Sequence, residues 1–212
     1  MSQTVFLKAI EAPTFLNSLP IRRFSVEEYH RIVEAGILDE DERVELIDGR
    51  ILKMSPIGSQ HAAYVSFLNR KLRPLEEAAI VRIQDPIILD DETEPQPDIA
   101  VVKFKANAYA DSHPRSEDVL LLMEVADTSL EEDRLIKLPR YADSGVPEVW
   151  IFNLIESIVE VYREPLTLAN GIPGYRRRTD FRAGEFVNPE AFPDLKIEIP
   201  KLNNLLELDV QE

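Results

Sequence analysis

The stretch that decides the fold runs from residue 95 to residue 154 and reads PQPDIAVV (95–102), then LLLMEVADTSLEEDRLIKLPRYADSG (120–145), then VPEVWIFNL (146–154). The first apolar run contains Asp98 and the second carries Glu124 near its end. Burying an unpaired carboxylate costs several kcal/mol, so such acids normally have a cation beside them. A helix-like stretch follows and supplies Asp133 and Lys137. Two acids on neighbouring strands and a lysine can hold a divalent metal beside a phosphodiester.

The composition is that of an ordinary globular chain. With 212 residues, 44% of them hydrophobic and 30% charged, the chain can bury a real core as one domain, 1–212. We expect the core of this domain at about 25–165, with 1–20 as a loose arm and 200–212 as a peripheral tail. No stretch has the length of a membrane span, and the absence of cysteine excludes disulfides and thiolate metal sites. These features predict a cytoplasmic protein without a membrane partner.

The formal net charge of −15 argues against a free-standing DNA-binding protein. Phosphate contacts dominate the affinity for nucleic acids, so proteins that bind them usually present basic surface. Acidic clusters lie at 39–42 and 90–94, whereas the basic clusters are small. A local basic groove is compatible with this charge, but the charge lowers the expectation that DNA is the partner.

The N-terminal part predicts a helix and a hairpin. Ser25 and Glu28 form a capping box, in which each side chain satisfies the other residue's backbone N–H, for a helix over 25–35. The segment VELIDGRILKM (44–54) is typical of a β-hairpin, because Asp48-Gly49 between alternating apolar strands favours a type I′ turn.

A second helix and three strand candidates come next. HAAYVSFLNRKL (61–72) predicts the helix, and 81–89, 98–104 and 119–126 are the strand candidates. The last two are continuously apolar, which predicts that both faces of the sheet are covered there. The polar segment 105–118 between them is expected to be a surface loop.

The chain then continues with a helix and a pair of strands. Thr128 and Glu131 suggest a second capping box and a helix over 129–143, in which Pro139 must introduce a kink or shift the helix start. VWIFNL (149–154) and SIVEVYRE (157–164) follow as paired strands. This order of elements predicts an α/β (α+β) fold: a central mixed β-sheet flanked by helices, with the N-terminal helix and β-hairpin added.

Asp98 and Glu124 are the candidate metal ligands. If their strands pair antiparallel, the two carboxylates meet on one side of the sheet and repel each other unless a cation lies between them. Mg²⁺ suits such a place, because it is bound by one or two carboxylates together with waters and a substrate phosphate. Lys137 would stabilise the charge that grows on the phosphate or help to deprotonate the water. Repulsion alone also implies that Asp98→Asn leaves the metal-free protein at least as stable as before.

The position of Lys137 on its helix leaves two interpretations open. Asp133 and Lys137 are four residues apart, so they share a face and could be a solvated ion pair or part of the site. A helical wheel places Leu135, Leu138 and Ala142 on one apolar stripe, with Lys137 on roughly the opposite side. Asp133 is therefore only a candidate accessory residue.

The strings PDIAVV…LLMEVADTSLEEDRLIKLPRYADSGVPEVWIFNL and VELIDGRILKMSPIGSQH together resemble the Uma-type putative endonuclease family. That family is a branch of the PD-(D/E)XK restriction-endonuclease-like superfamily, and the resemblance covers about residues 25–160. It implies a core of one helix, three antiparallel strands, a second helix and a further strand. Asp98 matches the motif aspartate and Glu124 the motif glutamate. The lysine expected two residues after Glu124 is Ala126 here, and Lys137 on the following helix takes its place in this branch.

Other candidates surround these residues. Glu45 matches the family as an accessory ligand or water holder, and a rim carboxylate on a hairpin is the alternative. Gln60 and His61 are candidate accessory residues, or simply residues at the start of a helix. Tyr141 and Trp150 are expected in the core. The three histidines of the chain show no local spacing typical of a zinc centre.

The most concrete interpretation is a Mg²⁺- or Mn²⁺-dependent phosphodiesterase that acts on DNA. Asp98 and Glu124 would hold the metal, Lys137 would serve the attacking water, and Glu45 would assist. Two alternatives stay open: an inactive nuclease-fold interaction module, and a metal-dependent hydrolase of a small phosphorylated substrate. Cleavage of both strands of a duplex would suit a twofold homodimer.

Overall fold

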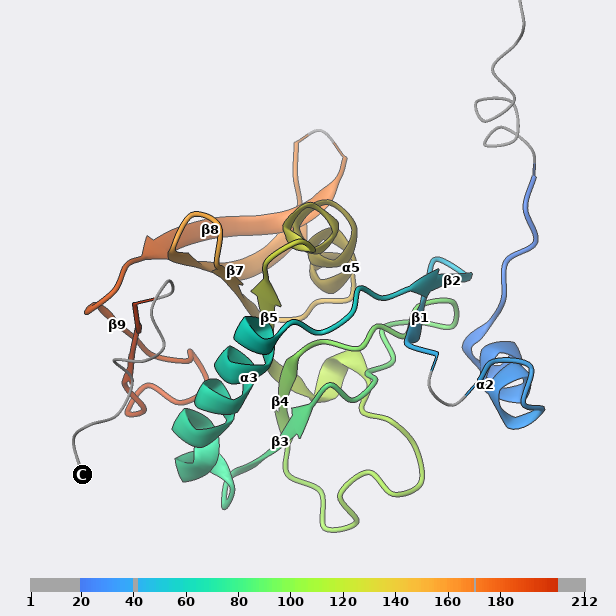
Figure 1. The fold of residues 1–212 in the computed structure, drawn as a ribbon, viewed down its shortest axis with the longest axis horizontal. Helices are drawn as coiled ribbons and strands as arrows, with labels where there is room; N and C mark the ends of the chain where they lie inside the picture. Colours follow the sequence, from blue (N-terminus) through green and yellow to red (C-terminus); the bar gives the residue numbers. More distant parts are fainter. Residues whose placement is uncertain (1–19, 40–41, 170, 202–212) are drawn as a thin grey trace, which may run out of the picture.

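A six-stranded mixed sheet forms the centre of the protein (Figure 1). The computed structural model describes residues 20–39, 42–169 and 171–201. The strands lie in the order β3-β4-β5-β6-β7-β8. Their bounds are Ala79–Ile83 (β3), Ile99–Lys103 (β4), Val119–Ala126 (β5), Glu148–Asn153 (β6), Ile158–Thr167 (β7) and Pro173–Phe181 (β8).

All neighbouring strands of this sheet pair antiparallel except β5 and β6, which run parallel. A parallel pair needs a crossover connection, and the helical segment between residues 130 and 143 supplies it. The predicted mixed sheet flanked by helices is confirmed, as is the predicted antiparallel pairing of the strands that carry Asp98 and Glu124.

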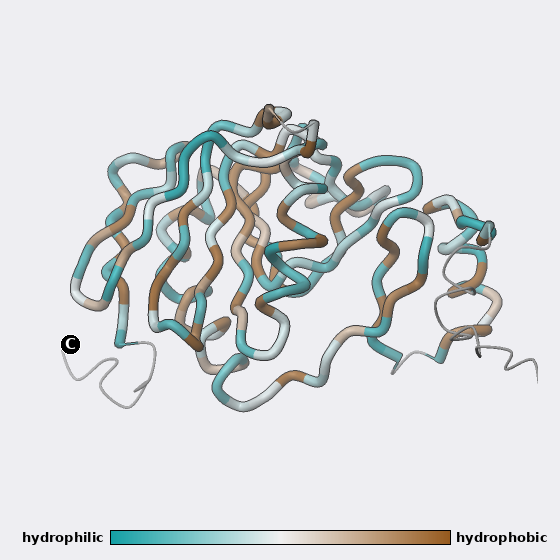
Figure 2. The backbone as a smooth tube through the Cα atoms, turned by 90° about the horizontal axis from the view of Figure 1, so that it is seen from above, coloured by the Kyte–Doolittle hydropathy of each residue, from teal (hydrophilic) through white to brown (hydrophobic). Residues whose placement is uncertain are grey.

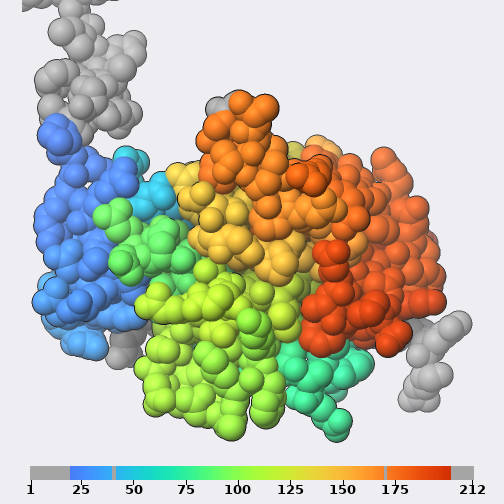
Figure 3. All heavy atoms as spheres, turned by 180° about the vertical axis from the view of Figure 1, so that it is seen from behind, coloured from blue at the N-terminus to red at the C-terminus, as the bar shows by residue number. Residues whose placement is uncertain are grey.

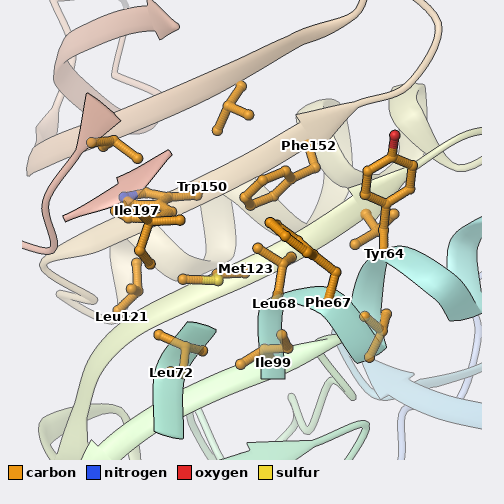
Figure 4. Packing of buried hydrophobic residues seen from close by; sticks show 14 of the residues in the cluster. Tyr64, Phe67, Leu68, Leu72, Ile99, Leu121, Met123, Trp150, Phe152 and Ile197 are labelled. Carbon is orange, nitrogen blue, oxygen red and sulfur yellow. The ribbon is translucent and has the colours of Figure 1, made fainter. Parts of the chain in front are cut away.

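Each face of the sheet carries its own hydrophobic core. Helix α3 (Ser59–Leu72) covers one face, where its buried side chains pack on Ile99, Met123 and Trp150 (Figure 4). The other face packs against the crossover through Leu138 and Tyr141. Brown, hydrophobic stretches follow the strands in Figure 2, as expected for a sheet buried on both sides.

Helix α2 (Val26–Glu34) and the hairpin of β1 (Val44–Ile47) and β2 (Arg50–Lys53) lie beside the sheet, at the right of Figure 1. The predicted capping box of α2 is confirmed, since Ser25 and Glu28 exchange both hydrogen bonds. The turn of the hairpin has φ values of 49° at Asp48 and 69° at Gly49, as a type I′ turn requires.

The smaller elements complete the described chain. The 3₁₀ segments span Arg73–Leu75 and Ser116–Asp118, and β9 (Phe186–Val187) pairs with β10 (Ile197–Glu198). The expected arm at 1–20 and the tail at 200–212 fall almost entirely on residues 1–19 and 202–212, outside the described ranges. None of the helices in the described ranges combines the length and the apolar composition needed to span a membrane.

The strand predicted over 81–89 is wrong in its second half. Strand β3 begins earlier, at Ala79, and ends at Ile83, because Gln84 takes a left-handed conformation with φ of 54°. Pro86, which has no N–H for a ladder, follows two residues later. The chain then leaves the sheet, and Ile88 forms only an isolated bridge with Arg115.

The regular helix predicted over 129–143 is also wrong. The crossover consists of α4 (Leu130–Glu132), a π-helical segment (Asp133–Lys137) and α5 (Leu138–Asp143), and the capping box expected from Thr128 does not form. Pro139 accounts for the wide turn: it has no N–H to donate, and its ring would clash with the carbonyl of Leu135 in a regular helix. The N–H of Leu138 instead donates to the carbonyl of Asp133, five residues back.

The wide turn changes which side chains face the sheet. Leu135, predicted in the apolar stripe, is 69% exposed, whereas Lys137, predicted on the opposite side, is 6% exposed. Leu138 and Ala142 are buried as predicted. A wheel drawn at 100° per residue fails here because a π-turn holds more residues than an α-turn.

The two leucines Leu68 and Leu135 test this assignment. Leu68 is fully buried against the sheet, so Leu68→Ala is expected to lower the free energy of unfolding by about 2–5 kcal/mol. Leu135→Ala is the matched control and should change it by less than about 0.5 kcal/mol, because the side chain is exposed. Urea unfolding curves of both variants measure the difference, and equal losses would contradict the π-helical arrangement.

Candidate active site

The pairing of β4 with β5 brings Asp98 and Glu124 together. Ile99 pairs with Met123 in the antiparallel ladder, so Asp98, one residue earlier, lies opposite Glu124. Side chains directly opposite each other in a sheet point to the same face. The two carboxylates are therefore cross-strand neighbours on the face that the crossover helix covers.

Backbone groups of the opposite strand hold both carboxylates. The N–H of Val125 donates to Oδ2 of Asp98 at 2.8 Å, and the N–H of Asp98 donates to Oε2 of Glu124 at 3.2 Å. Each acid is thus bonded to the strand that carries the other. This reciprocal arrangement fixes both side chains before any ligand arrives.

Two further groups bind Asp98. Its Oδ1 accepts hydrogen bonds from Nε2 of His61 at 2.8 Å and from Nε2 of Gln84 at 3.1 Å. Burial raises the pKa of Asp98, but His61, the Val125 N–H and Gln84 together hold it below its usual range. Asp98 therefore has structural partners, and repulsion alone no longer supports the expectation that Asp98→Asn spares the metal-free protein.

The pKa of Glu124 is shifted in the opposite direction from that of Asp98. Burial raises its pKa well above the usual range; Lys137 opposes this shift, whereas Asp133 and Asp98 add to it. The hydroxyl of Tyr141 donates to Oε1 of Glu124 at 2.6 Å. Tyr141 lies in the core as predicted, but its contact with the acid was missed, although it follows Lys137 by four residues and so shares its helix face.

Lys137 points into the site. Its Nζ lies 3.2 Å from Oε2 of Glu45 and 3.7 Å from Oε1 of Glu124. Burial alone would lower the pKa of Lys137, but the nearby acids Glu124, Glu45 and Asp133 raise it above its usual value. Lys137 is thus a buried, protonated cation, and the interpretation of Lys137 and Asp133 as a solvated pair is wrong, since both are buried.

Glu45 reaches the site from outside the central sheet. It lies on β1, is buried, and accepts a hydrogen bond from the N–H of Gln96 at 3.1 Å. The hairpin is attached to the rest of the protein by the bridge of Leu46 with Glu94 and by an ion pair of Asp48 with Arg140. Glu45 is therefore an interior residue of the site and not a rim carboxylate.

Asp133 and the cleft complete the arrangement. Asp133 accepts a hydrogen bond from Oγ of Ser129 at 2.8 Å, and burial raises its pKa to about 6. A cleft opens onto the site between the hairpin, the start of α3 and the crossover, and Arg43, Asp127 and Glu132 lie among its lining residues. Gln60 is exposed and is not among those lining residues.

The donor set fits a hard divalent cation. Glu45, Asp98, Glu124 and Asp133 provide carboxylate oxygens around one cleft, and oxygen ligands are what Mg²⁺ and Mn²⁺ prefer. In the described ranges these residues do not form a set of three donor atoms within 4.8 Å of one another. Asp98 and Glu124 would therefore hold an ion as a pair, which matches the one or two carboxylates that Mg²⁺ typically takes.

The raised pKa of Asp133 predicts a pH-dependent loss of stability in the metal-free protein. Between its ordinary value of 3.8 and about 6, the folded state holds the proton more tightly than the unfolded state, so stability falls as pH rises through this window. Asp133→Asn should raise the free energy of unfolding by about 1–3 kcal/mol at about pH 7.5 and change it little at about pH 4.

Urea unfolding in EDTA at the two pH values measures this effect. Asp180→Asn, at a side chain that is 41% exposed, serves as the control. An Asp133→Asn variant that is less stable than wild type at the higher pH would contradict the assignment.

A family model and a solved structure agree with this fold. The family model Uma2, described as "Putative restriction endonuclease", matches residues 26–201. A crystal structure described as "a putative nuclease belonging to DUF820 from Anabaena variabilis ATCC 29413" superposes with a TM-score of 0.62 at 17% identity, over 86% of this chain and 97% of that one. The type IIG restriction endonuclease BpuSI overlaps over 52% of this chain and 13% of its own, with a TM-score of 0.34 and 16% identity.

No curated protein matches the sequence. The family match spans most of the chain. The six-stranded sheet and the crossover helix of this chain form a nuclease-like fold. The chain therefore belongs to the Uma2 family of restriction-endonuclease-like proteins.

Proposed function

We propose that this protein is a divalent-metal-dependent nuclease that hydrolyses phosphodiester bonds in DNA. The observation that carries the proposal is the placing of Lys137: its Nζ lies within 4 Å of Glu45 and Glu124, beside the cross-strand pair of Asp98 and Glu124. Two adjacent carboxylates can hold a divalent ion, and a buried protonated lysine can offset the negative charge that grows on a phosphate.

Asp98 and Glu124 would hold the metal, Mg²⁺ or Mn²⁺. When bound, the ion supplies a water of lowered pKa and offsets negative charge on the phosphate oxygens. Other side chains of the protein position the two metal-binding acids. His61 and Gln84 hold Asp98 in position, while Tyr141 does the same for Glu124.

Lys137 acts as a cation in this proposal and not as a base. The neighbouring acids raise its pKa, so it keeps its proton at neutral pH. A protonated amine can donate a hydrogen bond to a phosphate oxygen while negative charge grows there. Glu45 aims the amine, because the 3.2 Å ion pair fixes Nζ on the side of the cleft.

The orientation of Lys137 also bears on the two alternatives. An inactive interaction module has no need to keep a lysine buried among acids, because such an ion pair rarely adds stability. A small phosphorylated substrate is compatible with the acidic residues Asp127 and Glu132 at the cleft. The proposal of DNA as the substrate rests on the family match. An assay on several substrates distinguishes DNA from a small phosphorylated substrate.

Replacement of Lys137 tests its part in catalysis. Lys137→Met keeps the length of the side chain and removes its charge, so it should lower the rate of cleavage about a hundredfold or more. The affinity for metal should not fall, because a protonated lysine cannot ligate a cation and its charge opposes the ion. The control is Lys105→Met, which removes a lysine that is 46% exposed and pairs with Asp118.

The assay uses supercoiled DNA, single-stranded DNA and a nucleotide phosphodiester, each with Mg²⁺ and with Mn²⁺. Equal rates for wild type and Lys137→Met would remove Lys137 from the mechanism. Cleavage of the nucleotide phosphodiester but of neither DNA would favour the small-substrate alternative, and no cleavage of any substrate would favour the interaction module.

Replacement of Asp98 tests the metal site. An ion that binds only the folded state raises the melting temperature, so wild type should melt higher in millimolar Mg²⁺ or Mn²⁺ than in EDTA. Asp98→Asn should lose both this increase and the cleavage activity, and it should also melt below wild type in EDTA, because the charged partner of His61 is gone. An Asp98→Asn variant that keeps the full metal-dependent increase would contradict the assignment.

A further inference from the structure

Three residues from distant parts of the sequence meet outside the nuclease-like site. His30 comes from α2, Glu94 from the connection between β3 and β4, and His113 from the loop between β4 and β5. One ligand atom from each lies within 4.8 Å of the other two. In the described ranges this is the one set of three histidine or carboxylate donors gathered so closely.

Glu94 is the fixed member of the set. Its N–H donates to the carbonyl of Leu46 at 2.7 Å and its carbonyl accepts from the N–H of Leu46 at 3.3 Å, so its backbone is held against β1. The carboxylate is buried, and its two oxygens lie 3.0 and 2.8 Å from Nε2 of His30. Both oxygens thus converge on one ring nitrogen.

His113 gives the cluster its third donor. The rings of His30 and His113 lie 6.1 Å apart and meet edge to face, at 75°. Both rings line a hollow of about 710 Å³, together with Asp90, Asp91 and Asp111. An ion in solution would reach the cluster through this hollow, and waters in it could complete the coordination.

A simple ion pair of His30 with Glu94 explains two of the residues but not the third. The ion pair by itself does not require a ring nitrogen of His113 within 4.8 Å of both partners. Two imidazoles and one carboxylate are instead a common protein ligand set for Zn²⁺, with the remaining position open.

We propose that His30, Glu94 and His113 form a second metal site, distinct from the site of Asp98 and Glu124, for a late first-row divalent ion and above all Zn²⁺. Imidazole nitrogen favours such ions, whereas the all-carboxylate set around Asp98 favours Mg²⁺ or Mn²⁺. The two sites therefore select different metals by ligand chemistry.

The positive charge of Arg82 should weaken metal binding at this site, so the proposal predicts the direction in which an Arg82 variant changes the affinity. Its Nη2 lies 3.5 Å from Nδ1 of His113 and 3.3 Å from Oδ2 of Asp85. A guanidinium beside a cation site repels the ion. Removal of the Arg82 charge should therefore tighten metal binding, whereas for a plain network of hydrogen bonds it would have no such effect.

The bound ion would fasten α2 to the body of the protein. Helix α2 is now attached near its start by the N–H of Val26, which donates to the carbonyl of Asp91 at 2.7 Å. On the face shown in Figure 3 the blue segment that holds α2 lies against the green connection before β4. A metal would replace the hydrogen bond of His30 with Glu94, in the middle of the helix, by coordination bonds to Glu94 and His113.

The test measures Zn²⁺ binding by calorimetry on the full chain without an affinity tag. All variants are made in an Asp98→Asn background, which removes ion binding at the nuclease-like site. The result for the second site therefore does not depend on whether the protein is a nuclease. We expect one equivalent of Zn²⁺ to bind, and the affinity to fall at least about tenfold in Glu94→Gln and in His113→Gln, since each removes one of three ligands. Arg82→Gln should bind more tightly.

The matched control is His61→Gln, which removes the histidine outside the cluster and should leave Zn²⁺ affinity unchanged. Co²⁺ gives a second readout that needs no ligand variant: strong visible absorption indicates a four- or five-coordinate ion in the Asp98→Asn protein. Absence of Zn²⁺ binding, equal affinity in His113→Gln, or a weak six-coordinate Co²⁺ spectrum would each overturn the proposal.

Discussion

The ladder between β4 and β5 holds two acids opposite each other, and the rest of the site compensates for them. Asp98 and Glu124 each accept a hydrogen bond from the backbone of the opposite strand, so neither can turn away. Around them the protein places one donor per acid from a helix, His61 for Asp98 and Tyr141 for Glu124, and one cation, Lys137. The result is an asymmetric pair, in which one acid is held ionised and the other resists ionisation. A divalent ion would satisfy both, because it favours the ionised form of each.

The crossover helix explains how a lysine reaches this site without standing on the strand. Ala126 occupies the strand position two residues after Glu124 and is fully buried in the core that Leu138 and Tyr141 share. A small residue there lets the crossover helix pack closely on the sheet. The π-turn then rotates Lys137 inward, to within 4 Å of Glu124. The strand position is thus used for packing, and the positive charge comes from the crossover helix.

Sequence patterns predicted the elements whose signal is local and missed those that depend on long-range contacts. The capping box at Ser25, the turn at Asp48-Gly49 and the buried strands around Asp98 and Glu124 follow from spacing alone. The end of β3 at Gln84 and the π-turn do not, because each depends on how a nearby proline is accommodated within the fold. The roles of the site residues remain predictions. The cluster of His30, Glu94 and His113 has no local spacing at all: its members are 64 and 19 residues apart, and only the fold unites them.

The parallel pairing of β5 with β6 has a consequence for the order in which the protein matures on the ribosome. The crossover that carries Lys137 is bounded by these two strands, so it is held against the sheet only once β6, which ends at Asn153, has left the exit tunnel. Domains assemble as the chain is synthesised, from the N-terminus onward. A nascent chain therefore exposes Glu45, Asp98 and Glu124 before Lys137 reaches them, and this cluster of charges is completed late in translation.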